Sequence, residues 1–251
     1  MSSSIPNAVD ADSALTSLQV RTRDWFAGVK PSLDFVAAAL LLLATWPILL
    51  VAAALVRLTS RGPAFYTQLR TGLGGEAFVL YKLRTMYADS ERDGPRWCLP
   101  GDSRITPVGR LLRWTHIDEL PQLVNVLRGE MSLVGPRPER PVIIRQLERA
   151  LPNYSLRTSV RPGLTGLAQV QQGPDTDLES VRRKLEYDLY YIEHAGPWLD
   201  VRILAGTLLK CLSVPFPAIR FLLGFPGFET KSGAIGAVVF EASLESSESV
   251  A

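Results

Sequence analysis

Two adjacent carboxylates, Asp118 and Glu119, are the residues of this chain best suited to phosphate chemistry. They precede Leu120-Pro121 and the apolar-periodic stretch 123–127, which predicts a short helix ended by Gly129. Two carboxylates beside a helix N-terminus can hold a divalent cation and a phosphate together. They can also serve the helix itself, with Asp118 as its N-cap and Glu119 at the positive end of its dipole. Spacing alone favours the cap.

Arginines that could bind a phosphate lie on the preceding predicted helix. Thr106-Pro107 is a helix-start signature, with Thr as the N-cap and Pro in the first turn. Arg110 and Arg113 are three residues apart and therefore share one face, while Leu111-Leu112 is expected to face the core. The planar guanidinium suits phosphate because it donates two parallel hydrogen bonds. An ordinary surface helix with one basic face explains the same pattern.

Two loops carry an arginine beside proline and glycine. The loop 135–138 holds Arg137 between two prolines, which restricts its backbone and partly positions the guanidinium. The loop 161–166 begins with Arg161 and is of the same kind. Both arginines are therefore candidate phosphate ligands, although Pro and Gly also mark ordinary turns.

Alternating apolar and polar residues predict a β-hairpin before these motifs. The strands are expected at Ala64–Leu69 and Glu76–Arg84, with Gly72 and two further glycines between them. Lys82 and Arg84 then project from one face of the second strand. They are either substrate ligands or two solvated cations.

A long apolar segment near the start of the chain favours attachment to a membrane. Phe35–Val56 contains 22 consecutive uncharged residues, which as one helix would reach about 33 Å. Pro47 lies in its middle and is expected to break or kink that helix. Basic residues flank both ends, which favours a re-entrant helix with both flanks in the cytoplasm. A kinked transmembrane helix remains the alternative.

The second half of the chain predicts further amphipathic helices. Leu178–Glu193 has a helical pattern that Asp177 can cap, and this capping explains the sequence Asp175-Thr176-Asp177 better than a metal site does. The segment from Pro197 to Leu209 either packs on the core or lies in the membrane interface. In the interface, three cations would extend to the lipid head groups, namely Arg202, Lys210 and Arg220.

The overall composition excludes several classes of protein. A net charge of +2 over 251 residues is too small to predict nucleic-acid binding. Of 27 basic residues only five are lysines, so arginine dominates. Cys98 and Cys211 are too far apart to suggest a zinc ribbon or a disulfide scaffold, and His116 and His194 form no metal-spaced pair. His116 is close enough to Asp118 in sequence to assist it.

Taken together, these stretches resemble the bacterial sugar transferase family of monotopic phosphoglycosyl transferases. The resemblance runs from about Lys30 to Leu212. It rests on the apolar segment broken by proline and on a series of ordered motifs: Arg61-Gly62-Pro63, Gln68–Gly72, Lys82–Met86, Asp102–Thr106, Asp118–Gln122, Asn125-Val126, Gly129–Glu139 and Pro162–Gln169.

The resemblance implies a particular chemistry. Asp118 matches the nucleophile that attacks the β-phosphate of a UDP-sugar and expels UMP, after which polyprenyl (undecaprenyl) phosphate takes the phosphosugar. Glu119 is assigned with Asp118 to the Mg²⁺ site. Arg113 and Arg137 match phosphate-binding arginines, and Arg161 is expected in the same pocket. Lys82, Arg84 and Arg110 complete the expected substrate-binding set.

The expected fold is α+β, mainly helical with a small β-hairpin, in a monotopic membrane protein. The divisions are a disordered tail at 1–30, a re-entrant membrane helix-break-helix at 31–60, a cytoplasmic catalytic domain with interfacial helices at 61–212, and a partly disordered tail at 213–251. The expected location is the bacterial inner membrane, facing the cytoplasm. A homo-oligomer and downstream glycosyltransferases are left open as partners. A catalytically inactive scaffold and a phosphohydrolase are the competing functions.

Overall fold

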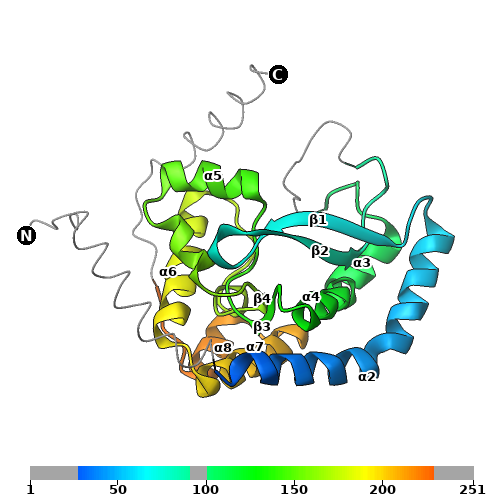
Figure 1. Cartoon of the computed structure of the whole chain (residues 1–251). Coiled ribbons are helices and arrows are strands. Elements are labelled where there is room, and N and C mark those ends of the chain that lie inside the picture. Colours follow the sequence, from blue (N-terminus) through cyan, green and yellow to red (C-terminus); the bar gives the residue numbers. More distant parts are fainter. Residues whose placement is uncertain (1–27, 91–100, 229–251) are drawn as a thin grey trace, which may run out of the picture.

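The structure, a computed structural model, describes residues 28–90 and 101–228. Most of the described chain is helical, and the strands form two small sheets of two strands each (Figure 1). The expected mainly helical α+β fold with a β-hairpin is confirmed. The expectations for the tails lie largely outside the described residues.

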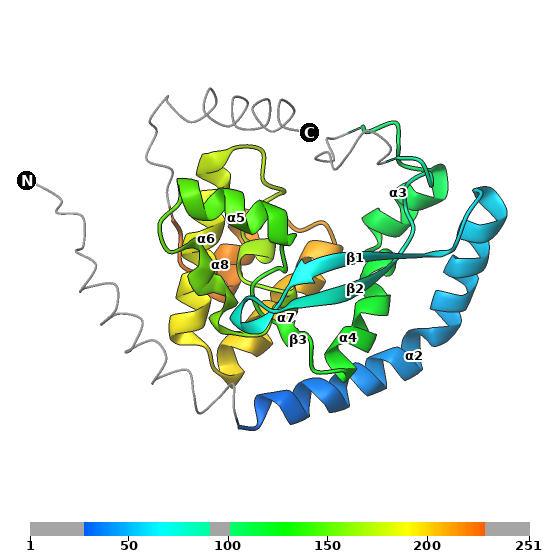
Figure 2. The ribbon, with the colours of Figure 1, turned by 45° about the horizontal axis from the view of Figure 1, so that its top comes forward.

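The apolar segment forms one helix, α2, at Lys30–Thr59. Pro47 lies inside this helix, which continues through it. The expected division into two helices is therefore not present. The helix bends instead, running along the lower edge of the molecule and then upward (Figures 1 and 2). Proline explains such a bend because it removes one backbone donor and crowds the preceding turn.

The surface of α2 is unusual for a helix in a water-soluble core. Within the described residues it is long and apolar enough to cross a membrane, yet only 17% of its most apolar window is buried. Leu40, Leu43, Trp46 and Leu50 are all at least half exposed. This apolar surface is compatible with a membrane location.

The hairpin follows the predicted pattern. Strands β1 (Phe65–Thr71) and β2 (Ala77–Leu83) are antiparallel, and a short 3₁₀ turn, η1 (Leu73–Gly75), joins them. Gly74 and Gly75 have φ values of 64° and 85°, which a residue without a Cβ adopts at little cost.

A second sheet brings the two Pro- and Gly-containing loops together. Its strands β3 (Ser132–Val134) and β4 (Gly163–Thr165) are parallel. The loop with Arg137 follows β3, and Arg161 comes just before β4. A Cβ on Gly163 would lie 2.1 Å from the backbone nitrogen of Gly135, so the strands can approach this closely only with glycine there. The loops of Arg137 and Arg161 are therefore neighbours.

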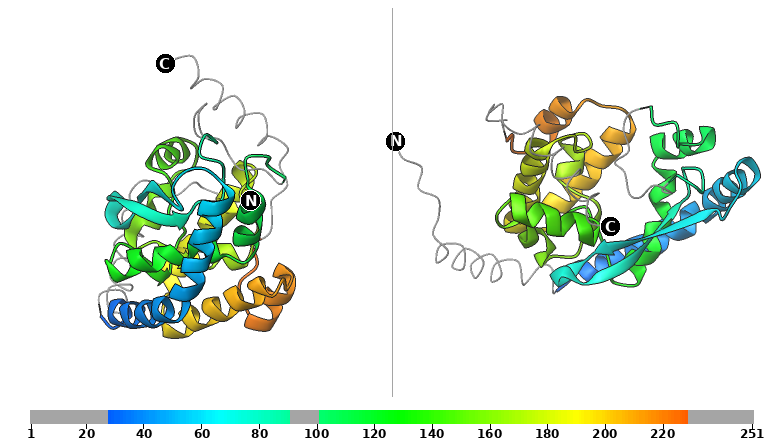
Figure 3. Two further views of the ribbon diagram at one scale, coloured as in Figure 1. Left: turned by 90° about the vertical axis from the view of Figure 1, so that its right-hand side faces the viewer. Right: turned by 90° about the horizontal axis from the view of Figure 1, so that it is seen from above.

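Helices surround this parallel pair. After the hairpin come α3 (Pro107–Trp114), η2 (Ile117–Gln122) and α4 (Leu123–Leu127), and after β3 come α5 (Pro141–Ala150) and η3 (Tyr154–Ser159). After β4 follow η4 (Ala168–Val170), α6 (Leu178–His194), α7 (Pro197–Cys211) and α8 (Phe216–Leu223). In Figure 1 and the left view of Figure 3, α5 lies on the upper side, while the first part of α2, α7 and α8 lie on the lower side.

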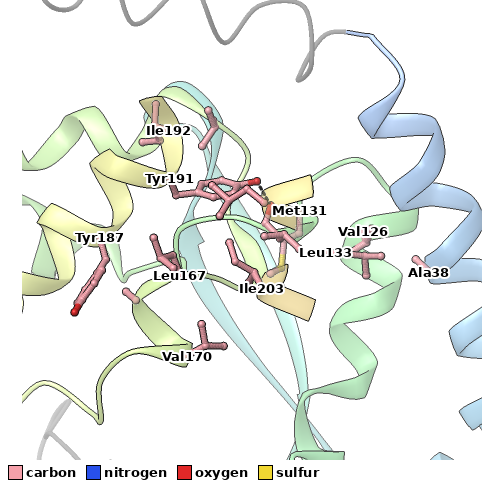
Figure 4. Packing of buried hydrophobic residues seen from close by; sticks show 14 of the residues in the cluster. Ala38, Val126, Met131, Leu133, Leu167, Val170, Tyr187, Tyr191, Ile192 and Ile203 are labelled. Atoms are coloured by element: carbon pink, nitrogen blue, oxygen red, sulfur yellow. Dashed lines mark hydrogen bonds between the residues drawn. The ribbon is translucent and has the colours of Figure 1, made fainter. Parts of the chain in front are cut away.

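The main core lies between these helices and the parallel strands. Leu133, Leu167, Tyr191 and Ile203 are buried together in it (Figure 4). Ala38 of α2 is fully buried against the same cluster. The membrane-compatible helix therefore packs directly on the rest of the protein.

A buried polar cluster also fixes the start of α2. Lys30 Nζ lies 2.6 Å from Asp200 Oδ2 of α7 and 3.3 Å from Asp34 Oδ2. Tyr191 donates to Asp200 Oδ1 at 2.8 Å, and Ser132 donates to Asp34 Oδ2 at 2.7 Å. These contacts orient α2 relative to α7 and β3.

Local sequence signals for helix starts are confirmed. Gly109 N donates to Thr106 Oγ1 at 2.9 Å, and Ser180 N donates to Asp177 Oδ1 at 2.7 Å. The prediction that Leu111 and Leu112 both face the core is wrong for Leu111, which is exposed while Leu112 is buried. The helix is only eight residues long, so its core-facing stripe admits one of two successive residues.

Arg202 and Arg220 bind other parts of the protein, instead of extending to lipid head groups as expected. Arg202 Nε donates to the Leu223 carbonyl at 2.7 Å and so binds the C-terminal end of α8. Arg220 donates to Gln171 Oε1 at 3.0 Å and to the Tyr187 hydroxyl at 2.9 Å. Both guanidinium groups hold helices of the protein together.

Candidate active site

The two carboxylates lie in a tight turn between α3 and α4. His116 adopts a left-handed conformation, with φ 56° and ψ 15°, and this ends the path of α3. Its backbone N–H donates to the Arg113 carbonyl at 3.3 Å, and its carbonyl accepts from Glu119 N at 3.2 Å. The following 3₁₀ turn, η2, contains Asp118 and Glu119 and packs against β2.

Glu119 is held by two cations from distant parts of the chain. Lys82 Nζ of β2 lies 2.9 Å from Glu119 Oε1. Arg137 Nη2 lies 2.5 Å from the same oxygen, and Arg137 Nη1 donates to Oε2 at 3.3 Å. Although burial opposes ionisation, these cations hold the pKa of Glu119 well below its ordinary value. Glu119 is therefore a carboxylate at any physiological pH.

Asp118 is in a different environment. Its side chain is buried, with the residue 7% exposed, and it takes part in none of the hydrogen bonds or ion pairs found among residues 28–90 and 101–228. Burial, with the neighbouring Glu119 charge, raises the pKa of Asp118 to about 6. The positive charges of Lys82, Arg113 and Arg137 act in the opposite direction.

The helix ends exclude one of the two interpretations of Asp118, that of a helix cap. Neither η2 nor α4 has a side-chain hydrogen bond at its N-cap, so Asp118 caps neither element. The Asp118 carboxylate, with no protein partner among the described residues, is therefore available to a ligand. Groups with perturbed pKa values also concentrate at functional sites.

The expected phosphate-binding arginines divide into two groups. Arg113 donates through Nε to Thr85 Oγ1 at 2.8 Å. Its positive charge, like that of Arg137, lowers the pKa of Asp118. Arg110 is exposed on the surface of α3. Among residues 28–90 and 101–228, no contact of the Arg161 side chain places it beside the carboxylates. The structure therefore joins Arg113 and Arg137 to the site.

Lys82 and Arg84 have different positions despite their spacing. Lys82 contacts Glu119, as described, whereas Arg84 turns toward the end of α2. Its Nη2 donates to the Ser60 carbonyl at 2.9 Å and to the Gly62 carbonyl at 3.3 Å. Arg84 is buried in this position and fixes the connection between α2 and β1.

A buried charge network holds the backbone on either side of Arg137. Arg157 Nη2 donates to the Arg137 carbonyl at 2.9 Å and lies 2.6 Å from Asp188 Oδ2. Arg70 Nη1 donates to the Pro138 carbonyl at 2.9 Å, and Lys184 pairs with Glu139. None of these cations except Arg137 was predicted as part of the site. Their contacts bridge residues 20 to 68 positions apart, which no local pattern reveals.

Two further residues near the carboxylates were not predicted as ligands. These are His116 and Lys210 of α7. The charge of Arg137 lowers the pKa of each, and the charge of Glu119 raises it. Burial and neighbouring cations lower the pKa of His116, so the imidazole is neutral at pH 7. Only its position two residues before Asp118 indicated a link to the site.

No group of three or more His, Cys, Asp or Glu side chains in the described part of the chain is arranged to enclose a metal ion. A site that binds a cation through one or two carboxylates would not form such a group. Asp118 has its carboxylate free for a cation, whereas both oxygens of Glu119 already accept hydrogen bonds.

The geometry defines a carboxylate and arginine site at the junction of a membrane-compatible helix and a compact domain. Residues 25–214 match the profile of the family described as bacterial sugar transferase, and the chain belongs to this family.

Individual relatives have more specific names. Over 188 residues the chain is 42% identical to the UDP-N-acetylgalactosamine-undecaprenyl-phosphate N-acetylgalactosaminephosphotransferase of Aeromonas hydrophila, an alignment that covers 75% of this chain and 44% of that protein. It is 45% identical over 186 residues to the UDP-glucose:undecaprenyl-phosphate glucose-1-phosphate transferase of Caulobacter vibrioides, covering 73% of this chain and 70% of the relative. The similarly named Escherichia coli protein is 38% identical over 184 residues, with 72% and 40% covered.

The chain thus spans less than half the length of the Aeromonas and Escherichia relatives and about two thirds of the Caulobacter relative. The residues that match the family, 25–214, include Lys82, Glu119 and Arg137.

Proposed function

We propose that this protein transfers a sugar 1-phosphate from a UDP-sugar to polyprenyl (undecaprenyl) phosphate and releases UMP. The observation that carries the proposal is the contrast between the two carboxylates. Glu119 is neutralised by Lys82 and Arg137, while Asp118 is buried and has no partner among the described residues. The relatives' names supply the classes of donor and acceptor.

Asp118 is the nucleophile in this proposal. One carboxylate oxygen attacks the β-phosphorus of the UDP-sugar, a new phosphorus–oxygen bond forms, and the bond from that phosphorus to the bridging oxygen breaks. The electron pair leaves on UMP. An oxygen of the polyprenyl phosphate then attacks the same phosphorus, and the Asp118 carboxylate leaves. Covalent catalysis of this kind divides one difficult displacement into two easier ones.

The surrounding cations stabilise the negative charge of the phosphoryl group during transfer. Arg113 and Arg137 stabilise the negative charge on the equatorial oxygens of the transferring phosphoryl group. Glu119 keeps Arg137 and Lys82 in position, because it binds both. The backbone contacts from Arg157 and Arg70 prevent the Arg137 loop from moving away.

Mg²⁺ is the cofactor we propose, with Asp118 as its protein ligand and Glu119 as a weaker candidate. The residues fit this ion, because Mg²⁺ usually takes one or two carboxylates and completes its shell with water and substrate phosphates. When bound, the ion would neutralise charge on the diphosphate of the donor. Arg113, Arg137 and Lys82 remain the positive groups that the chain itself supplies.

We further propose that α2 is a re-entrant membrane helix and that the site faces the cytoplasm at the inner membrane. The exposed apolar side chains of α2 and the basic residues at both of its ends support this arrangement. A cysteine introduced at Ser32 and another at Ser60 are both expected to resist an impermeant thiol reagent in intact cells. Labelling of one but not the other would mean that α2 spans the bilayer.

The biological role we propose is the first membrane step in assembling an exopolysaccharide, an O-antigen or a related glycan. The relatives act on at least two donors, UDP-glucose and UDP-N-acetylgalactosamine, so a panel of UDP-sugars is the appropriate assay. With undecaprenyl phosphate in excess, the purified protein should release UMP from one of them over many turnovers; without it, UMP release should stop at about one equivalent per enzyme.

The variant Asp118→Asn tests the role of the nucleophile, because the amide keeps the size of the side chain and lacks the negative charge. We expect it to remain folded and membrane-bound and to transfer no radiolabelled phosphosugar to the lipid fraction. Retained transfer would refute the mechanism. For the wild-type protein, release of free phosphate without an acceptor would indicate a phosphohydrolase, and absence of Mg²⁺-dependent lipid labelling with every donor tested would indicate a scaffold.

A further inference from the structure

Lys210 is a half-buried cation beside the carboxylate site that the mechanism above leaves without a role. It is the penultimate residue of α7. The charges of both Arg137 and Glu119 act on it, yet its ammonium takes part in none of the hydrogen bonds or ion pairs among the residues that the structure describes. A cation in such a position is available for a negatively charged ligand.

A chain of contacts turns this end of α7 toward the Arg137 loop. The hydroxyl groups of Thr207 and Thr165 lie 2.7 Å apart, and the Thr165 carbonyl accepts from Gly135 N at 2.9 Å. Lys210 follows Thr207 by three residues and therefore lies on the same side of the helix. The ammonium is thus directed to the part of the fold where β3 and β4 present the arginine loop.

Exposed apolar side chains of α7 lie away from Lys210. Leu204 and Leu208 are four residues apart and both are exposed, and Leu204 is about 120° around the helix from Lys210. Leu208 is about 200° around the helix from Lys210, since successive residues are about 100° apart. In Figure 1 and the left view of Figure 3, α7 and α8 lie on the same lower side as the first part of α2. The end of α7 therefore borders both the apolar surface and the carboxylate site.

We propose that Lys210 binds the phosphate group of the polyprenyl phosphate acceptor; this inference rests on the proposed function. The acceptor differs from the donor in having an apolar chain, which the exposed leucines on the outer side of α7 can accommodate. Its phosphate must reach Asp118, and Lys210 is on the side of α7 that faces the Arg137 loop, where the charges of Arg137 and Glu119 influence it. Burial and the Arg137 charge also lower the pKa of Lys210, an effect that a bound phosphate would offset.

Kinetics with each substrate varied separately test this assignment. The variants are Lys210→Met and Lys210→Gln, which remove the charge, Lys210→Arg, which keeps it, and Arg145→Met, which removes an exposed charge from the distant α5. We expect the Met and Gln variants to raise the KM for undecaprenyl phosphate about tenfold, the scale of losing one charge-assisted hydrogen bond. The KM for the UDP-sugar should stay within about twofold of wild type, as should both constants for the other two variants.

Direct binding provides a readout that does not depend on turnover. Affinities for undecaprenyl phosphate, undecaprenol and phosphatidylglycerol are compared in neutral detergent micelles without a donor. The charge-removing variants should lose affinity for undecaprenyl phosphate alone. An unchanged acceptor affinity would overturn the proposal, and so would a raised donor KM or an equal loss for phosphatidylglycerol. If wild type binds undecaprenyl phosphate but transfers nothing to it, the proposed function fails while this comparison still decides the role of Lys210.

Discussion

The pair formed by Arg157 and Asp188 gives a quantitative test of how the Arg137 loop is held. Both side chains are only 2% exposed, and Arg157 donates to Asp188 Oδ2 at 2.6 and 3.0 Å. Asp188→Asn would leave the guanidinium in the interior without its principal counter-charge. Breaking a buried pair from one side costs about 3–5 kcal/mol. We expect the lower end, about 3 kcal/mol, because Glu139 Oε1 lies 3.7 Å from Arg157 Nη1 and offsets part of the loss.

The measurement is thermal unfolding followed by circular dichroism in detergent micelles. For a domain of this size a loss of about 3 kcal/mol corresponds to a fall in Tm of about 6–12 °C. Glu193→Gln, on the same helix but with a side chain 55% exposed, is the matched control and should change stability by less than about 0.5 kcal/mol. If Asp188→Asn unfolds at the same temperature as this control, the buried network does not stabilise the loop as argued.

Two other predictions follow from the site and the parallel strands. Because the pKa of Asp118 is raised to about 6, the carboxylate that attacks phosphorus is protonated in acid, and the pre-steady-state burst of UMP should fall as the pH drops through this region. Lys82→Met removes a charge that lowers this pKa, so the midpoint measured from pH 5 to 8 at fixed Mg²⁺ should move to higher pH, and a move to lower pH would contradict the electrostatic account. Gly163→Ala places a Cβ 2.1 Å from Gly135 N and should cost at least about 2 kcal/mol of stability, whereas Gly173→Ala, which meets nothing within 4 Å, should be nearly neutral; equal melting temperatures would show that the close approach is not required.

Local features of the fold were predictable from the sequence because neighbours along the chain determine them. The Thr106 and Asp177 caps and the hairpin required only short patterns, and the structure confirms each. The parallel pair of β3 and β4 was not predictable, since each strand has three residues and they are some thirty positions apart. Such short strands have no detectable period.

The site shows the same division. The sequence identified Asp118 and Glu119, but spacing favoured a helix cap, and only the missing cap hydrogen bond and the lack of any described partner decide against it. Lys82 and Arg84 were expected on one strand face. Lys82 binds Glu119, whereas Arg84 binds the backbone at the end of α2. The alternation of side chains predicts the face of the strand from which each residue projects, but not the residue that it contacts there.

The position of Lys210 could not be inferred for a related reason. A cation in an amphipathic segment is expected at the boundary with solvent or lipid head groups. Lys210 instead lies toward the domain, because the Thr207 hydroxyl binds Thr165 and sets the rotation of α7. That contact joins residues 42 positions apart, and no feature of either segment predicts it.

The most direct test of the central claim is to trap the covalent intermediate. The purified protein would be incubated with Mg²⁺ and the preferred UDP-sugar without acceptor, quenched in acid and digested, and the peptide containing Asp118 weighed by mass spectrometry. We predict that this peptide gains the mass of one phosphosugar, loses it when undecaprenyl phosphate is added before quenching, and remains unmodified in Asp118→Asn. A protein that transfers phosphosugar to lipid with no modified Asp118 peptide at any time would contradict the account.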